Sequence, residues 1–303
     1  MRPCKPSVTI ITFNESKNIH RAINSVFSIA DEIVIVDSGS TDDTLDIARS
    51  FGEKVKIFEH KFEGYGQQKN YAADLCKNDW ILNIDADEEV SEDLCNSIKE
   101  LIDSSSTNYS MDVAGMYRFA RLNFFCGRPL YHGGWYPDYN IRFYNRRVAN
   151  WAMPFVHEEL RYKDDLEMLN KLNAPLSLKT MVGTLNGDLY HYTFQDVESN
   201  VRTNIRYARL GSKKILLKLS KSKSLDSLEK PNTDYLLLKY RLLLEIFFHP
   251  IIKFFECYFI KHGFLDGVHG FIIAVNAAHS IFMKYYFAYM DLISLANNKE
   301  LNN

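Results

Sequence analysis

The sequence lacks the features that would assign it at once to several common classes. Its five cysteines form no CxxC pair, which argues against a zinc site or a disulfide scaffold and favours a reducing compartment. A formal net charge of −2 over 303 residues argues against a protein that coats nucleic acid. The apolar run Val8–Phe13 is too short for a signal peptide. Gly267–Met283 is interrupted by polar residues before it reaches the ~20 residues of a spanning helix. We therefore expect a cytoplasmic protein.

Two phosphate-binding motifs are also missing. No GxGxxG follows the first apolar run and no GxxxxGK[ST] occurs, which argues against a dinucleotide fingerprint and a P-loop. A nucleotide bound by this chain would need side-chain carboxylates for its base and a metal ion for its diphosphate.

The sequence does contain an acidic cluster directly after an apolar run, in Trp80–Glu89 (WILNIDADEE). The run has the length and β-branched content of a buried strand, and Asp85 and Asp87 follow one residue apart. Two carboxylates this close repel each other unless a cation lies near them. Mg²⁺ or Mn²⁺, itself holding phosphate oxygens, is the usual solution. A solvated acidic turn is the alternative for a lone Asp-x-Asp.

Strand-like and helix-like segments alternate through the first half of the chain. Strands are expected at Ser7–Phe13, Glu32–Val36, Val55–Phe58 and Trp80–Ile84, and helices at Ser16–Ile29, Asp43–Phe51 and Gln68–Leu75. This alternation predicts an α/β fold with a doubly wound, mostly parallel sheet. Parallel strands end at one edge of such a sheet, where ligands bind. The side chains expected along that edge are Thr12, Asn14, Glu15, Asp37, Asp85 and Asp87.

Four segments, in this order and spacing, resemble the nucleotide-sugar half of family 2 glycosyltransferases, which have the GT-A fold: SVTIITFNE, IVDSGSTDDT, GYGQQKN and NIDADEE. Later segments resemble more narrowly the lipopolysaccharide-core glycosyltransferases of the WaaE/KdtX type: HGGWYPDYNIRFYNRR, PFVHEEL, LYHYT and GFLDGVHGF. The resemblance implies transfer of a hexose or heptose from a nucleotide-diphosphate sugar, by metal-assisted inverting displacement. The implied acceptor is a lipopolysaccharide core or another lipid-linked glycan.

The same resemblance assigns roles to individual residues. It implies that Asp37 hydrogen-bonds the nucleobase, that Lys69 contacts the nucleotide or its phosphates, and that Asp87 ligates the metal. Asp85 would orient the ribose or a metal-bound water, or act as a second ligand. The residues implied beside Asp37 are Thr12, Asn14 and Glu15. Taken alone, Asp37 is more typical of an Asx-turn and Lys69 of a solvated helix.

The implied reaction needs charge neutralisation at the leaving diphosphate, alignment of the acceptor, and a base for the hydroxyl proton. The metal serves the first need. Arg142 and Arg146 in NIRFYNRR could add positive charge there, and surface ion pairing is an equal alternative for both.

Two carboxylates are candidates for the base. Asp138 ends the segment HGGWYPD, whose glycines permit a ligand to approach the backbone, and Glu158 lies in PFVHEEL. The histidines His157 and His191 are candidates to complete the ligands of the metal. A structural hydrogen bond is the alternative for either histidine.

The chain changes character near residue 195, so we expect two domains, at residues 1–195 and 196–303. The first would bind the nucleotide sugar and carry catalysis. The second is rich in helix-like segments that combine basic and aromatic residues. Such segments favour either a helical appendage or peripheral docking on the inner face of the cytoplasmic membrane, where basic groups meet anionic headgroups.

Two other classes of protein remain as alternatives. A haloacid-dehalogenase-type phosphatase also uses Asp-x-Asp after a strand, but usually with Thr or Val two residues after the second Asp, where this chain has Glu89. A non-catalytic nucleotide-sugar-binding or membrane-scaffold protein would keep the fold without the turnover. The intact pair of Asp85 and Asp87 favours the enzyme.

Overall fold

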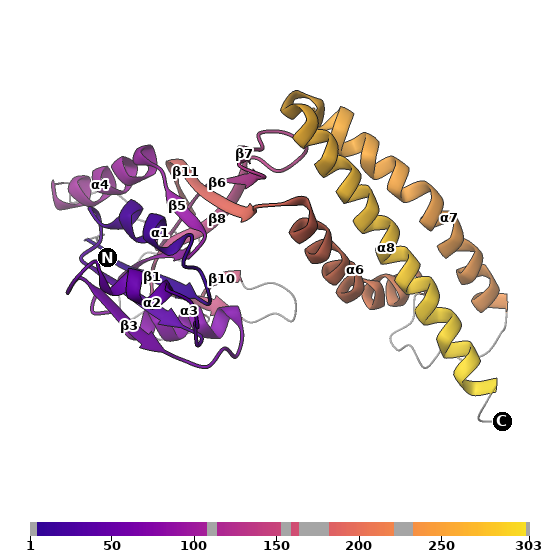
Figure 1. The fold of residues 1–303 in the computed structure, drawn as a ribbon, viewed down its shortest axis with the longest axis horizontal. Helices are drawn as coiled ribbons and strands as arrows, with labels where there is room; N and C mark the ends of the chain where they lie inside the picture. Colours follow the sequence, from indigo (N-terminus) through magenta and orange to yellow (C-terminus); the bar gives the residue numbers. More distant parts are fainter. Residues whose placement is uncertain (1–4, 108–113, 153–158, 164–181, 221–232, 301–303) are drawn as a thin grey trace. The chain divides into compact units, whose positions relative to one another are not determined.

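A computed structural model describes residues 5–107, 114–152, 159–163, 182–220 and 233–300 (Figure 1). The chain divides into two compact units, each described here by itself. The first comprises Met1–Leu122 and Pro137–Tyr192, and the second Asn123–Tyr136 and Thr193–Asn303. The domain boundary expected at residue 195 stays a prediction.

The first unit contains most of a nine-stranded sheet with the order β3-β2-β1-β4-β8-β6-β11-β5. The ninth strand, β7, pairs with the end of β6 and belongs to the second unit. The parallel strands are β1 (Ser7–Thr12), β2 (Glu32–Asp37), β3 (Val55–Glu59) and β4 (Trp80–Asp85). Strand β1 lies between two others, pairing Thr12 with Asp37 on one side and Ile11 with Asp85 on the other. This register brings the ends of three strands together at one edge.

Helices cover both faces of the parallel strands, as a doubly wound sheet requires. They are α1 (Ile19–Val26), α2 (Thr44–Arg49), α3 (Tyr65–Asp74) and α4 (Glu92–Thr107). Neighbouring residues of β4 enter different cores: Leu82 packs with residues of α1, α2 and α4, whereas Ile81 packs with Ala72 and Ala73 of α3. Burial on both faces explains why these strands read as continuous apolar runs. The predicted α/β fold is confirmed.

Antiparallel strands complete the sheet. They are β5 (Glu88–Val90), β6 (Met116–Phe125), β7 (Arg128–Pro129), β8 (Asp138–Asn145) and β11 (Val182–Phe194). Strand β8 pairs antiparallel with both β4 and β6, and β11 pairs antiparallel with β5. A separate ribbon joins β9 (Ala149–Ala152) to β10 (Glu159–Tyr162). Because β8 and β11 lie beside the ends of β4 and β5, they can add side chains to the same edge.

The second unit is helical, which confirms the C-terminal helical appendage. Its elements are α6 (Val197–Ser220), α7 (Thr233–Phe255), the π-turn η3 (Glu256–Ile260), the 3₁₀ turn η4 (Gly263–Asp266) and α8 (Gly267–Glu300). Leu216, Leu242, Ala288 and Leu292 are completely buried where α6, α7 and α8 meet. Among the described residues, one helix, Gly263–Leu295, is long and apolar enough by length and composition to cross a membrane. The core helix of a soluble protein meets the same criterion.

A glycine-lined corner joins two of the segments that the sequence singled out. His132 and Asp266 are 134 positions apart, yet the His132 backbone N–H and its Nδ1 each lie 2.8 Å from the Asp266 carboxylate. The Gly133 N–H donates to the Lys261 carbonyl at 2.8 Å. A Cβ on Gly270 would lie 1.8 Å from the Gly263 carbonyl oxygen, so this crossing requires glycine.

Candidate active site

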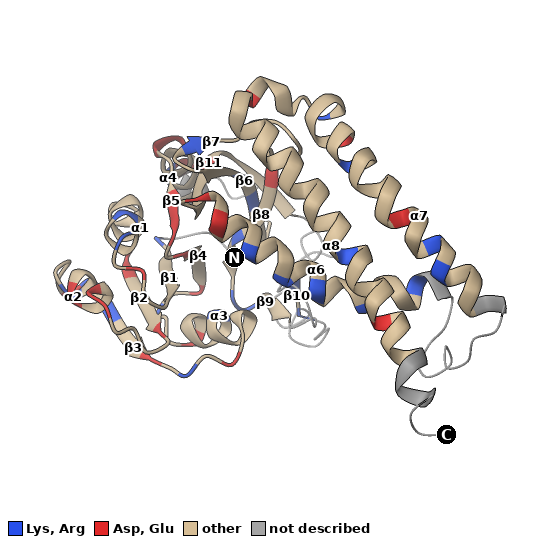
Figure 2. Cartoon of the chain, turned by 45° about the vertical axis from the view of Figure 1, so that its right-hand side comes forward, with Lys and Arg blue, Asp and Glu red and all other residues tan. Residues whose placement is uncertain are grey.

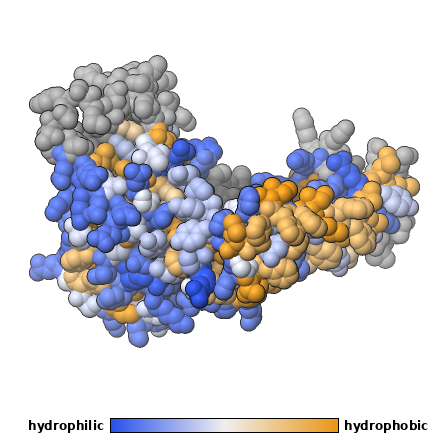
Figure 3. All heavy atoms as spheres, turned by 90° about the horizontal axis from the view of Figure 1, so that it is seen from above, coloured by the Kyte–Doolittle hydropathy of each residue, from blue (hydrophilic) through white to orange (hydrophobic). Residues whose placement is uncertain are grey.

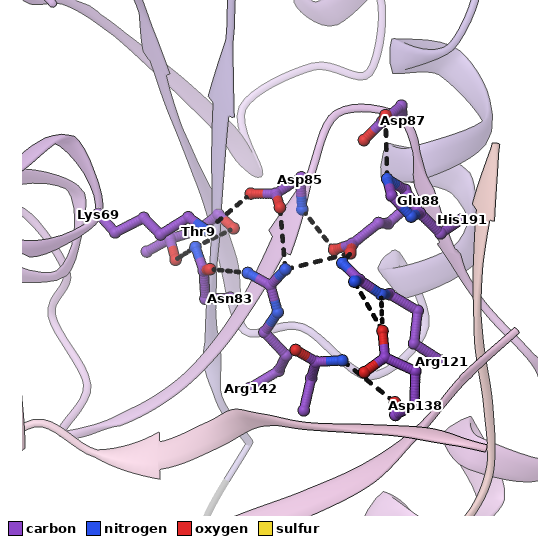
Figure 4. A network of polar contacts seen from close by, with 11 residues as sticks. Thr9, Lys69, Asn83, Asp85, Asp87, Glu88, Arg121, Asp138, Arg142 and His191 are labelled. Carbon is purple, nitrogen blue, oxygen red and sulfur yellow. Dashed lines mark hydrogen bonds and ion pairs between the residues drawn. The ribbon is translucent and has the colours of Figure 1, made fainter. Parts of the chain in front are cut away.

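Six charged side chains of alternating sign form one chain of contacts at the edge of the first unit (Figure 4). Listed so that each residue contacts the next, they are Lys69, Asp85, Arg142, Glu88, Arg121 and Asp138. They come from helix α3 and from strands β4, β8, β5 and β6. Each carboxylate therefore has at least one cationic neighbour.

Asp85 ends β4 between two buried cations. Lys69 Nζ lies 3.1 Å from Asp85 Oδ1, and Arg142 Nη2 donates to Asp85 Oδ2 at 2.9 Å. Burial alone would raise the pKa of Asp85, but attraction by Arg142 and Lys69 outweighs this and holds the pKa well below its usual range. Asp85 is thus a fixed anion. Lys69 is only 1% exposed, so it is not the solvated helix residue that its position alone suggested.

Glu88 is the buried centre of the chain, and sequence reasoning missed it. Its side chain is fully buried and accepts the backbone N–H of Asp85 at 2.8 Å. It also accepts from Arg142 Nη2 at 3.2 Å and lies 3.5 Å from Arg121 Nη1. In the sequence, Glu88 stands within the acidic cluster Trp80–Glu89 without a role of its own. The signal that could have revealed it is Arg121 and Arg142 inside strands, because a buried arginine needs a buried acid.

Asp138 begins β8, opposite Arg121 on β6 in the antiparallel register. Arg121 Nε and Nη2 both donate to Asp138 Oδ2, at 3.0 and 2.7 Å. The structure therefore brings this candidate base into the same charged chain as Asp85. The Asp138 side chain keeps 39% of its surface exposed. The second candidate base, Glu158, and the candidate ligand His157 lie outside the described residues.

The two arginines of NIRFYNRR have different surroundings. Arg142 is buried and also donates to Asn83 Oδ1 at 3.0 Å. Arg146 instead donates to the Ala73 carbonyl at 2.7 Å and faces Asp79. Surface pairing is therefore not the role of Arg142, which belongs to the site.

Asp87 lies in the turn after β4, on a different side of the cluster from Asp85. Its Oδ2 is 3.3 Å from His191 Nε2, because β11 pairs with β5 and the Tyr192 N–H donates to the Asp87 carbonyl at 3.0 Å. Glu15 lies close enough to Asp87 for the charge of the Asp87 carboxylate to affect the pKa of Glu15. Burial raises the pKa of Glu15; a hydrogen bond from Asn18 opposes the rise, and the Asp87 charge adds to it. Asp87 and Glu15 are thus two carboxyl groups close enough to influence each other.

A divalent cation fits Asp87 better than Asp85. Asp85 already has two cationic partners, whereas Asp87 has an imidazole beside it and a carboxyl group, Glu15, whose ionisation it opposes. Within the described parts of the chain, no group of three or more His, Cys, Asp or Glu side chains is placed to hold a metal. Among the described residues, Asp87 and His191 are the candidates for protein ligands, and phosphate oxygens and water could supply others, as is usual for Mg²⁺ at phosphate sites.

At the edge where the parallel strands end, Asp37 is fully buried at the end of β2. Its Oδ2 accepts the backbone N–H groups of Gly39 at 2.8 Å and Ser40 at 2.7 Å, and the Ser40 hydroxyl donates to its Oδ1. This is the Asx-turn that the sequence offered as the alternative. The predicted nucleobase contact of Asp37 stays a prediction.

The other predicted nucleotide-site residues adjoin the same turn. Thr12 is buried at the end of β1, and Asn14 Oδ1 accepts the Thr41 N–H at 2.8 Å. The Glu15 N–H donates to the Thr44 hydroxyl at 2.8 Å. Thr12, Asn14 and Glu15 thus adjoin the Asp37 turn, as the strand-end argument predicted, and their contacts with a nucleotide stay predictions.

Comparison with known proteins now assigns the family. Residues 7–161 match the family described as Glycosyl transferase family 2. The chain belongs to glycosyl transferase family 2. A glycosyltransferase of Rickettsia bellii is 33% identical to it over 285 residues, which cover 92% of this chain and 84% of that protein. Family membership confirms the predicted glycosyltransferase class and its GT-A fold.

One further relative of this family 2 glycosyltransferase and one solved structure extend the comparison. The lipopolysaccharide core biosynthesis glycosyltransferase LpsC of Rhizobium meliloti is 28% identical over 281 residues, covering 91% of this chain and 89% of LpsC. The solved structure of S. aureus TarS 1-349 in complex with UDP-GlcNAc is 15% identical, with a TM-score of 0.41, covering 96% of this chain and 92% of that one. A phosphatase that uses Asp-x-Asp belongs to a different family, so that alternative is set aside.

Proposed function

We propose that this glycosyltransferase transfers a hexose or heptose from a nucleotide-diphosphate sugar to a lipopolysaccharide core or a similar lipid-linked glycan. Similarity to LpsC along 91% of the chain supports this acceptor class. The observation that carries the donor half is the division within the Asp-x-Asp pair. The negative charge of Asp85 is compensated by Lys69 and Arg142, whereas Asp87 contacts His191.

The donor would be held by residues at the ends of β1, β2 and β4. Asp87 and His191 would hold Mg²⁺ or Mn²⁺, which when bound neutralises the charge that develops on the leaving diphosphate. Asp85, kept ionised and immobile by its two cations, would accept hydrogen bonds from the ribose. Because Lys69 is occupied by Asp85, its role in this proposal is to orient Asp85 rather than to touch phosphate.

The acceptor hydroxyl would attack the anomeric carbon from the side opposite the diphosphate, which inverts the configuration. The new bond joins the hydroxyl oxygen to that carbon while the bond from the carbon to the diphosphate oxygen breaks. Asp138 would take the hydroxyl proton, and its two hydrogen bonds from Arg121 would hold the carboxylate in place. Glu158 remains the second candidate for this base.

Two measurements test the proposal: the thermal shift produced by a panel of nucleotide sugars with and without Mn²⁺, and the release of nucleoside diphosphate. Asp87→Ala should abolish metal-dependent turnover, and His191→Ala should raise the Mn²⁺ concentration needed for it. Asp79→Ala is a matched control, since Asp79 pairs with Arg147 outside the charged chain. Normal turnover by Asp87→Ala would refute the proposed metal site.

The base is tested separately. Asp138→Asn and Glu158→Gln should both leave the donor-induced thermal shift intact, and the variant that loses transfer identifies the base. Full transfer by both variants would show that neither carboxylate takes the proton.

A further inference from the structure

Between residues 242 and 260, every residue that is exposed as a whole is Leu, Ile or Phe, and the His249 side chain, at 42%, is the polar one with the most exposed surface. Those Leu, Ile and Phe residues have exposed fractions from 49% at Phe259 to 72% at Ile260. They recur every three or four positions, which places them on one side of α7 and η3. We call these residues, with three that follow at the corner, the apolar face: Leu244, Phe247, Phe248, Ile251, Ile252, Phe255, Phe259, Ile260, Phe264, Leu265 and Val268.

The apolar face is additional to the core of the helical unit. The core side of α7 is filled by Tyr235, Leu238 and Leu242, which are buried against α6 and α8. Figure 3 shows apolar surface running along the helical unit, in contrast to the mainly hydrophilic first unit. A large apolar side chain has a surface of ~150–250 Å². Eleven such side chains, each about half exposed, present on the order of 1,000 Å². That is more than the ~300–600 Å² of the largest patch on a typical monomer, so a partner is expected.

The polar residues of α7 and η3 form a stripe of their own. Glu245, His249, Lys253 and Glu256 recur at intervals of three or four residues; Glu245 contacts His249, and Lys253 pairs with Glu256. None of the four belongs to the apolar face. Helix α7 therefore has a buried side, a polar stripe and an exposed apolar side, the arrangement of a helix that lies in a membrane interface.

We propose that the apolar face docks on the surface of an anionic lipid bilayer. A protein partner would meet about one hydrogen bond per 100–200 Å², but none of the eleven side chains of the apolar face has a donor or acceptor. Acyl chains need none. Residues 239–262 carry four Lys and Arg against two Glu, and this net positive charge suits anionic headgroups. Lys261, directly after Ile260, is exposed and pairs with Glu256 at 2.6 Å.

Contacts within the unit favour docking over spanning, although α8 is long enough to cross. Buried Asn276 of α8 donates to Asn200 of α6 at 2.9 Å, and Asp291 accepts from Arg209 at 2.8 Å. Helix α8 is thus held by polar contacts to α6. Figure 2 shows the basic residues along α6, and Arg202, Arg206 and Lys213 are among those exposed. A helix pair with that many exposed charges would be costly to place in the hydrocarbon core.

The apolar face ends at the corner that holds the loop His132–Tyr136. Phe264 and Leu265 lie next to Asp266, the residue that both the backbone and the ring of His132 contact. Docking would therefore hold this loop at the bilayer, where a lipid-linked acceptor presents its sugar. This last step rests on the proposed function; the docking itself does not.

Flotation of the full chain with vesicles tests the docking. The chain should float with vesicles of phosphatidylcholine containing phosphatidylglycerol, and less with phosphatidylcholine alone. Ile251→Glu/Phe255→Glu should weaken flotation at least about tenfold. Leu210→Glu is the matched control, because Leu210 is 58% exposed on α6, outside the apolar face, and it should float like the unaltered chain.

A second measurement does not depend on a disruptive change. Ile260→Trp should show blue-shifted fluorescence on adding the same vesicles, whereas Leu210→Trp should not. The docking is overturned if the unaltered chain stays in solution, if Leu210→Glu loses flotation equally, or if light scattering shows a lipid-independent dimer that the double variant abolishes. Nucleoside diphosphate release by the double variant with a delipidated acceptor should stay normal. Failure of the unaltered chain to release it would instead refute the proposed function alone.

Discussion

Replacing Arg142 by Met should destabilise the first unit far more than a similar change at the surface. The Arg142 guanidinium contacts Asn83 Oδ1 at 3.0 Å, Asp85 Oδ2 at 2.9 Å and Glu88 Oε1 at 3.2 Å. Met can fill much of the same space but supplies no charge. Among the described cations, the substitution would leave fully buried Glu88 with Arg121, at the longer distance of 3.5 Å, and Asp85 with Lys69.

Removing one partner of a buried ion pair costs about 3–5 kcal/mol. For a unit of this size each kcal/mol corresponds to roughly 2–4 °C, so the unfolding midpoint should fall by ~6–20 °C. Arg147→Met is the matched control. Arg147 is half-exposed and pairs with Asp79 at 2.7 Å, a surface salt bridge for which ~0–1 kcal/mol is expected.

The assay is urea unfolding of the single variants Arg142→Met and Asp85→Asn and of the double variant. Once Arg142 is absent, Asp85 is less well compensated, so removing its charge should cost less than it does in the unaltered chain. The double variant should therefore be more stable than the sum of the single effects predicts, by about 1 kcal/mol or more. Additive effects, or an Arg142→Met cost no larger than that of Arg147→Met, would refute the account of the charged chain.

Three further predictions follow from single residues. Gly270→Ala should destabilise the helical unit by several kcal/mol, because its Cβ would lie 1.8 Å from the Gly263 carbonyl oxygen. Gly211→Ala is the control: its Cβ would meet the flexible Lys284 side chain at 3.1 Å, so this substitution should be neutral or stabilising. Thermal unfolding of the two variants compares them. The Asp85 carboxyl has a pKa below its unfolded value of about 3.9, so its contribution is complete above that pH and is lost as the pH falls through the folded pKa. The stability gap between the unaltered chain and Asp85→Asn should accordingly narrow on acidification. Burial raises the pKa of the Cys76 thiol to about 12, so thiol reagents at mildly alkaline pH should label Cys76 only after unfolding.

The parallel half of the fold and the position of the site could be predicted from the sequence, because both depend on short-range patterns. Continuous apolar runs mark β1, β2 and β4, and parallel register then brings Thr12, Asp37 and Asp85 to one edge. The contacts within the site could not be predicted in the same way. Those of Arg142 depend on how β8 pairs with β4 and β6, which is set by tertiary packing rather than by local preference.

The contact between His191 and Asp87 also could not be predicted from the sequence. His191 lies more than a hundred residues after Asp87, and the two meet only because β11 pairs with β5. In the sequence His191 was one of two histidine candidates without a distinguishing feature. Lys69 was ambiguous for a related reason, because helical periodicity does not show which polar residue of α3 faces a buried acid.

The two aspartates of the Asp-x-Asp pair are separated by strand geometry, and this decides where a cation can act. Asp85 is the last residue of β4, where Lys69 and Arg142 compensate its charge. Asp87 lies in the turn, where the carboxyl group of Glu15 is near it and the His191 imidazole lies 3.3 Å from its carboxylate. A metal bound at Asp87 would therefore relieve repulsion, whereas one placed at Asp85 would have to displace a lysine or an arginine. We therefore propose that the pair serves as one structural anion, Asp85, and one metal ligand, Asp87, rather than as two equivalent ligands.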